Sequence, residues 1–119
     1  MKILIAGYDI DIAKIKSELN TVDINCELYF KEHPLGKITN RDSSFFQDIP
    51  KKIDFIVYLF SEFSDSSDFK VFWVFVRSNV NTDKIYYLCF ESFQKKHQLE
   101  EVESMTEISL EQLKLIISK

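Results

Sequence analysis

The sequence predicts an α/β domain, a doubly wound parallel sheet of about five strands with helices on both faces. Three observations predict it. The apolar runs 2–6 and 53–60 are continuous rather than alternating, which is typical of strands buried on both faces. A third strand-like run, 84–90, follows the same pattern. Segments of helical periodicity stand between these runs, and the 119 residues have the length of one ordinary domain, so we expect residues 1–119 to form one folding unit.

The first predicted helix comes directly after the first strand and Gly7. Its apolar residues recur at helical spacing: Ile12, Ile15, Leu19 and Val22. Asp9 or Asp11 is expected to cap its N-terminus. From Ile24 to Phe30, apolar and polar residues then alternate with the two-residue period of a strand that has one face exposed to solvent. This alternation predicts an edge strand.

The segment 31–52 holds both prolines of the chain, Pro34 and Pro50, together with Gly36. Proline interrupts helices and is confined to the edges of sheets, so we expect no more than a short helix around 44–48 in this segment.

Two structures are open for the segment 68–78, because apolar residues lie on both of its helical faces. As a helix, it has Ser66 or Ser67 as its N-terminal cap and crosses over between two parallel strands. As a strand, it forms an antiparallel meander over 53–90, and its Val, Phe and Trp residues favour that structure. The helix completes a regular alternation of strands and helices, and we prefer it for that reason.

The C-terminal helix has the clearest start signal in the chain. Ser109 precedes Leu110, Leu113 and Ile117, which share one helical face, so Ser109 is the expected N-terminal cap. Between the strand 84–90 and this helix we expect a further, weakly indicated helix and a short strand.

The resulting order of elements resembles the receiver domain of bacterial response regulators. Residues 2–9 look like the first receiver strand with its acidic turn, 53–59 like the third strand, and 108–117 like the last helix. The alternating run 24–30 takes the place of the second strand, which is an edge in the flavodoxin-like strand order 2-1-3-4-5. The resemblance implies a flavodoxin-like fold and a role in bacterial signalling or regulation.

The residues of receiver phosphorylation chemistry are replaced in this chain. The phosphoacceptor aspartate falls on Leu59, and the Ser or Thr that ends the fourth strand falls on Cys89. The acidic pair that holds Mg²⁺ falls on Gly7 and Tyr8, with only Asp9 beside them, and the lysine expected after the fifth strand is missing. Without a carboxylate nucleophile no aspartyl phosphate forms. The resemblance therefore implies a degenerate receiver that works without phosphorylation.

Charge and composition disfavour several classes of function. The net charge is −4 and no basic stripe exists to neutralise phosphates, so we expect no direct binding of nucleic acid. The apolar runs are shorter than the roughly 20 residues that span a bilayer. The N-terminus lacks the features of a signal peptide, and a cytoplasmic location is expected.

Few residues offer chemistry of their own. Gly7 and Gly36 are the two glycines of the chain, which is too few for a phosphate-binding loop. Cys26 and Cys89 lie in apolar runs and are expected to be buried free thiols rather than a disulfide.

Acidic residues follow the predicted strands, where the carboxyl ends of a parallel sheet meet. Candidate ligands of a hard cation such as Mg²⁺ are Asp9, Asp11, Glu62 and Glu91. The alternative is that Asp9 and Asp11 only complement the positive end of the first helix and that the others are solvated turn residues. We prefer this alternative, so the sequence predicts no metal site, no catalytic residue and no cofactor.

Apolar residues on the outer sides of two predicted helices are the candidates for binding a partner. On a helix over 68–78, Val71, Val74 and Phe75 point away from the core-facing residues, and Leu115 does the same on the last helix. A protein partner or a homodimer would cover them; alternatively, they belong to the core.

We therefore expect a non-enzymatic, receiver-like protein-interaction module. One alternative is a small acidic inhibitor or immunity-type protein that occludes a target enzyme, which the net charge of −4 permits. The other is an Mg²⁺-dependent ligand-binding domain that uses the acidic residues.

Overall fold

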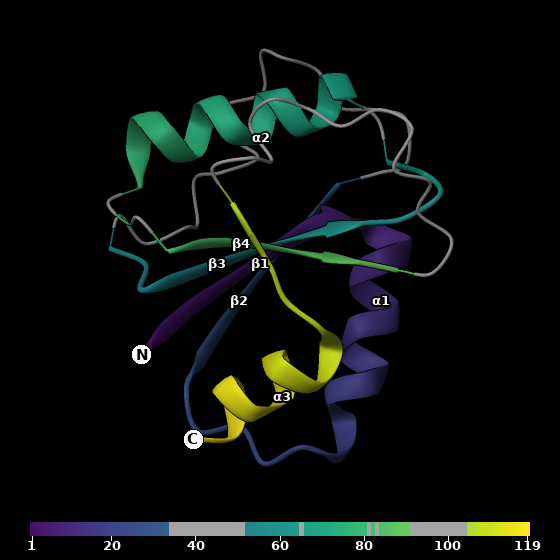
Figure 1. Cartoon of the computed structure of the whole chain (residues 1–119), viewed down its shortest axis with the longest axis vertical. Coiled ribbons are helices and arrows are strands. Elements are labelled where there is room, and N and C mark those ends of the chain that lie inside the picture. The colour runs from purple at the N-terminus through teal and green to yellow at the C-terminus, as the bar shows by residue number, and fades with distance from the viewer. Residues whose placement is uncertain (34–51, 65, 81, 83, 91–104) are drawn as a thin grey trace.

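The computed structural model describes residues 1–33, 52–64, 66–80, 82, 84–90 and 105–119 (Figure 1). Its strands are β1 (Lys2–Tyr8), β2 (Glu27–His33), β3 (Phe55–Phe60), β4 (Ile85–Cys89) and β5 (Thr106–Glu107). Its helices are α1 (Asp9–Glu18), which continues into a 3-10 turn η1 (Leu19–Thr21), α2 (Ser66–Asn79) and α3 (Leu110–Ser118).

The strands form one parallel sheet in the order β2-β1-β3-β4-β5, which is the flavodoxin-like order. The predicted α/β fold class is therefore confirmed. β3 and β4 pair in parallel, with Ile56 opposite Ile85, and α2 is the crossover between them, which excludes the antiparallel meander. β2 lies at the edge, as its alternating sequence predicts.

Helices cover both faces of the sheet, with α2 on one side and α1 and α3 on the other (Figure 1). On one face, α2 buries Phe69, Phe72 and Val76 against β-strand residues such as Tyr58 and Phe60. On the other face, α1 and α3 pack against alternate residues of the same strands. These are Ile3, Ile5, Val57 and Leu59 of the sheet with Ile12, Ile15, Leu113 and Ile117 of the helices. Because neighbouring residues of a strand point to opposite faces, the continuous apolar runs fill both layers.

Gly7 lets β1 and β3 approach each other at the carboxyl end of the sheet. A Cβ atom at this position would lie 3.1 Å from Cβ of Leu59, closer than ordinary van der Waals contact. The sequence places Gly7 just after the first predicted strand, whereas in the structure Gly7 lies within β1, which runs to Tyr8.

The start of α1 differs from the prediction. Tyr8, the last residue of β1, is the N-cap, and it makes no side-chain capping bond. Asp9 is already the first helical residue, where its Oδ1 accepts a hydrogen bond from the Ile10 amide at 2.8 Å. The predicted capping by Asp9 or Asp11 is wrong because β1 runs two residues further and turns directly into the helix.

The start of α3 agrees with the prediction. Ser109 Oγ accepts a hydrogen bond from the Gln112 amide at 3.1 Å, and the Ser109 amide donates to Gln112 Oε1 at 2.8 Å. This capping box satisfies two amide donors that the first turn of a helix leaves unpaired.

The end of α3 explains why β2 begins three residues later than predicted. The Asn25 amide donates to the carbonyl of Ile117 at 3.0 Å, and Asn25 Nδ2 donates to that of Ser118 at 2.7 Å. These bonds satisfy carbonyl groups that the C-terminal turn of a helix leaves without a partner. The chain around Asn25 therefore hydrogen-bonds to the end of α3 instead of pairing with β1.

The short helix expected around 44–48 and the helix expected between the last two strands lie outside the described residues. Cys26 and Cys89 are free thiols, but both are half-buried rather than buried. No helix in the described parts of the chain is long and apolar enough to span a bilayer.

Candidate functional site

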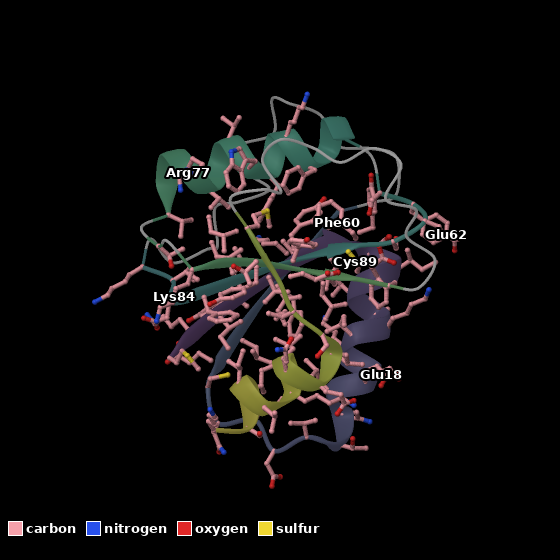
Figure 2. All side chains as sticks on the ribbon, in the orientation of Figure 1. Glu18, Phe60, Glu62, Arg77, Lys84 and Cys89 are labelled. Atoms are coloured by element: carbon pink, nitrogen blue, oxygen red, sulfur yellow. The ribbon has the colours of Figure 1, made fainter. Side chains whose placement is uncertain are left out.

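The carboxyl end of the sheet is the place where doubly wound folds bind ligands. β1 and β3 run in parallel with Ala6 opposite Tyr58, so the residues that follow both strands emerge at the same edge. Figure 2 shows Glu62 and Cys89 on this side of the molecule, where α1 begins. The carboxyl edge is the candidate functional site.

A buried pair of polar side chains lies at this edge. Asp11 of the first turn of α1 is 0% exposed and Ser61, directly after β3, is 1% exposed. Ser61 Oγ donates a hydrogen bond to Asp11 Oδ2 at 2.5 Å. The bond joins α1 to β3 across 50 residues of sequence and is short, as expected when the acceptor is charged.

The turn after β3 holds Ser61 in place. Ser64 Oγ accepts from the Ser61 amide at 2.8 Å, and the Ser64 amide donates to the Ser61 carbonyl at 3.1 Å. The Phe63 amide donates to Ser61 Oγ at 3.2 Å. The Ser61 hydroxyl oxygen thus accepts a hydrogen bond from the Phe63 amide, and its own proton points to Asp11.

Burial raises the pKa of Asp11 above its ordinary value of 3.8, because a charged carboxylate loses its hydration there. The hydrogen bond from Ser61 and the charge of Lys14 oppose this rise in pKa, while the negative charges of Glu62 and Asp9 add to it. The other carboxylate oxygen, Asp11 Oδ1, is buried and has no hydrogen-bond partner in the regions that the structure describes. Such an oxygen destabilises the charged form of Asp11.

The raised pKa predicts a specific dependence of stability on pH. The folded state binds a proton more tightly than the unfolded state, so the free energy of unfolding falls as the pH rises from about 4 through the folded-state pKa of Asp11. In an Asp11→Asn variant this fall is absent, because asparagine can accept the Ser61 hydrogen bond without a charge. We expect the variant to be more stable than the wild type at pH 7, with a smaller difference at pH 4, in urea unfolding.

Asp9→Asn is the matched control, because Asp9 is exposed and lies two residues away. It is expected to change the free energy of unfolding little at either pH. A loss of stability in Asp11→Asn at pH 7 would contradict the prediction. If that loss also required Mg²⁺ in the buffer, the Mg²⁺-dependent alternative would gain support.

The candidate cation ligands are placed differently from one another. Asp11 is buried, whereas Asp9 and Glu62 are exposed, and Glu91 lies outside the described residues. The charges of Asp9 and Glu62 act on Asp11, so the three carboxylates lie near the same edge. Nevertheless, no three His, Cys, Asp or Glu side chains in the described ranges are arranged to hold a metal ion.

The Asp11–Ser61 pair has the composition of a nucleophile beside a base, but its burial works against that role. A serine that attacks a substrate must reach the reacting carbon, and Ser61 is enclosed by the protein in this conformation. The pair instead acts as an internal connection between the start of α1 and the end of β3.

The candidate partner-binding residues are divided between two faces. Val74 on α2 and Leu115 on α3 are each 62% exposed, and their helices cover opposite faces of the sheet. They do not form one patch. Val71 and Phe75 lie within α2, but their side chains are outside the described part of the structure.

The sequence indicated the edge but not the bond across it. The predicted strand 53–60 ends directly before Ser61, which places Ser61 at the same edge as Asp11, but nothing in the sequence links the two side chains. The local signal was the pair Ser61 and Ser64, whose spacing is typical of a turn closed by a serine hydroxyl. No local signal selects Asp11 over Asp9 as its partner.

Comparison of the chain with protein-family models, with curated proteins and with solved structures found no match.

Proposed function

We propose that this chain is a non-enzymatic protein-interaction module with a receiver-like fold, which works in bacterial signalling or regulation without phosphotransfer. The observation that carries the proposal is the exposure of Val74 on α2. The inner side of α2 is already buried through Phe69, Phe72 and Val76, and the helix still presents a valine that is 62% exposed. An apolar side chain on the outer side of a helix that is already packed suits contact with a partner.

The end of β3 supports the absence of phosphotransfer. Leu59, at the position of the receiver phosphoacceptor, is 0% exposed and packs in the layer formed with α1 and α3. Phe60 is buried on the other face, and Ser61 is bound to Asp11. None of these three side chains offers a free carboxylate to a phosphoryl donor.

The charges beside Val74 indicate the kind of protein surface that would dock there. Lys70 and Arg77, four residues before and three residues after Val74, are exposed on the same side of α2. The Arg77 guanidinium lies 5.6 Å from the centre of the half-buried Trp73 ring, which holds it against the helix. A partner surface with an apolar centre and acidic flanks would complement this stripe.

Site-specific photo-crosslinking tests the proposal. A photo-reactive residue in place of Val74 is expected to give one discrete cross-linked product in the cells that naturally express the protein. The same residue in place of Leu115 is the matched control, because Leu115 is equally exposed and lies on the opposite face. Equal products from both positions, or none from position 74, would contradict docking on α2.

A further inference from the structure

The end of β3 contacts helices on both faces of the sheet through two consecutive residues. Neighbouring residues of a strand point to opposite faces. Phe60 faces α2, where its ring centre lies 5.2 Å from that of Phe69. Ser61, directly after the strand, donates to Asp11 of α1 at 2.5 Å. The hydrogen bond at the carboxyl edge is therefore one residue away from the packing of α2.

The turn after β3 leads from this hydrogen bond into α2. The Phe63 amide donates to Ser61 Oγ at 3.2 Å, and the Ser64 amide donates to the Ser61 carbonyl at 3.1 Å. One residue separates Ser64 from Ser66, where α2 begins. A displacement of the turn therefore moves the first turn of α2 with it.

The hydrogen-bonded arrangement contains a destabilising feature. Asp11 is 0% exposed, and its Oδ1 has no hydrogen-bond partner in the described part of the chain. A buried oxygen without a partner destabilises the arrangement that buries it, and the effect is larger when the group is charged. Asp9 and Glu62 lie within two residues of the pair and are exposed, so a small movement of the turn would bring water to Asp11.

The charges around Asp11 favour such a movement. Lys14 of α1 attracts the carboxylate, whereas Glu62 of the turn and Asp9 of α1 repel it. Two negative charges thus act against one positive charge. Opening of the turn hydrates the carboxylate and moves Glu62 away from it, at the expense of the hydrogen bond from Ser61.

We propose that the turn 61–64 exists in two conformations and thereby regulates docking on α2. In the closed conformation, Ser61 is bound to Asp11. In the open conformation, the turn has moved away and water reaches the Asp11 carboxylate. Only the closed conformation presents α2 to its partner. The regulation rests on the proposed function, because it acts on the same exposed side of α2.

The exposed side of α2 depends on the position of the first turn of the helix. Lys70, Val74 and Arg77 lie on this side, and Lys70 directly follows the first four residues of α2. Displacement of the first turn therefore changes the position of Lys70 relative to Val74. A partner that binds only the closed conformation shifts the equilibrium toward it, so docking and closure of the turn favour each other.

NMR relaxation dispersion on the whole chain tests for the two conformations, because such rearrangements occur in microseconds to milliseconds. At pH 7 we expect exchange at the amides of Phe63 and Ser64 and at that of Phe69 in α2. Asp11→Asn removes the charge that favours opening and keeps an acceptor for Ser61, so the exchange disappears at all three amides. Lowering the pH toward 4 reduces the exchange, because protonation of Asp11 removes the same charge.

Ser61→Ala acts in the opposite direction. It removes the hydrogen bond that holds the turn closed, so the ratio of open to closed conformation rises at least about tenfold. The matched controls are Asp9→Asn and Ser17→Ala, which change exposed residues of α1 without removing the hydrogen bond. Both are expected to change the exchange little. Circular dichroism shows that each variant is folded.

Cross-linking at position 74 separates the regulation from the docking itself. At equal amounts of protein, Ser61→Ala is expected to lower the yield of the cross-linked product to about half or less, because the apparent affinity falls with the closed fraction. Asp11→Asn keeps the yield at least at the wild-type level. A yield that Ser61→Ala leaves unchanged would overturn the regulation and leave the docking on α2 standing. A wild type that gives no product would overturn the proposed function, and the regulation of docking falls with it.

Two results of the NMR experiment would overturn the proposal independently of any partner. The first is the absence of exchange at Phe63 and Ser64 in both the wild type and Ser61→Ala. The second is exchange that is confined to the turn and does not reach Phe69, since α2 would then not follow the turn.

Discussion

Replacement of Phe69 by alanine is expected to lower the free energy of unfolding by about 3–5 kcal/mol, the usual cost of deleting a fully buried aromatic ring. Phe69 is 0% exposed and lies at the centre of the layer between α2 and the sheet. Its ring centre is 5.0 Å from that of Tyr58, at an interplanar angle of 75°, and 5.2 Å from that of Phe60. The edge-to-face geometry with Tyr58 adds to the loss beyond the buried area.

Val74→Ala is the matched control for this experiment. Val74 lies on the same helix but is exposed, so its truncation is expected to change the free energy of unfolding by no more than about 0.5 kcal/mol. Urea unfolding of both variants measures the difference. Equal losses for the two variants would mean that α2 does not pack through Phe69.

Replacement of Ser61 by alanine is expected to cost about 2–3 kcal/mol at pH 7, because the buried Asp11 carboxylate then loses its hydrogen bond at Oδ2, while Oδ1 already has no partner among the residues that the structure describes. The loss depends on pH. Without the Ser61 hydrogen bond, which lowers the pKa of Asp11, this pKa rises further, and the cost becomes smaller as the carboxyl group is protonated toward pH 4.

Unfolding in urea at pH 4 and pH 7 measures this dependence. Ser17→Ala, on the exposed side of α1, is the control for the intrinsic effect of the substitution. The double variant Asp11→Asn with Ser61→Ala separates the two causes: if charge burial dominates, Ser61→Ala costs less when Asp11→Asn is already present. A cost of Ser61→Ala that is equal at both pH values would show that Asp11 is not charged in the folded state.

The fold class was predictable because its signals are local. Continuous apolar runs indicated β1 and β3 as buried strands, and alternation indicated β2 as an edge strand. Ser109 and Gln112 lie three residues apart and form the capping box by themselves. Each of these signals depends only on residues that are close together in the sequence. It can therefore be recognised without knowledge of the rest of the structure.

Local signals in the sequence did not determine the conformation of the segment 68–78. Its Val, Phe and Trp residues favour a strand, and apolar residues on both sides of the helix weaken the helical pattern. The parallel pairing of β3 with β4 requires a crossover between them, and only α2 provides one.

The carboxyl edge shows the same division. The sequence by itself determined that Asp9, Asp11 and Ser61 would lie at one end of a parallel sheet, because this follows from the order of strands and helices. The tertiary structure alone decided that Asp11 is buried against Ser61 while Asp9, two residues earlier, is exposed. It likewise decided that Asn25 serves the end of α3 instead of extending β2. Both contacts join residues 50 or more positions apart. The sequence pattern of a single segment does not identify which distant residues that segment will contact in the folded protein.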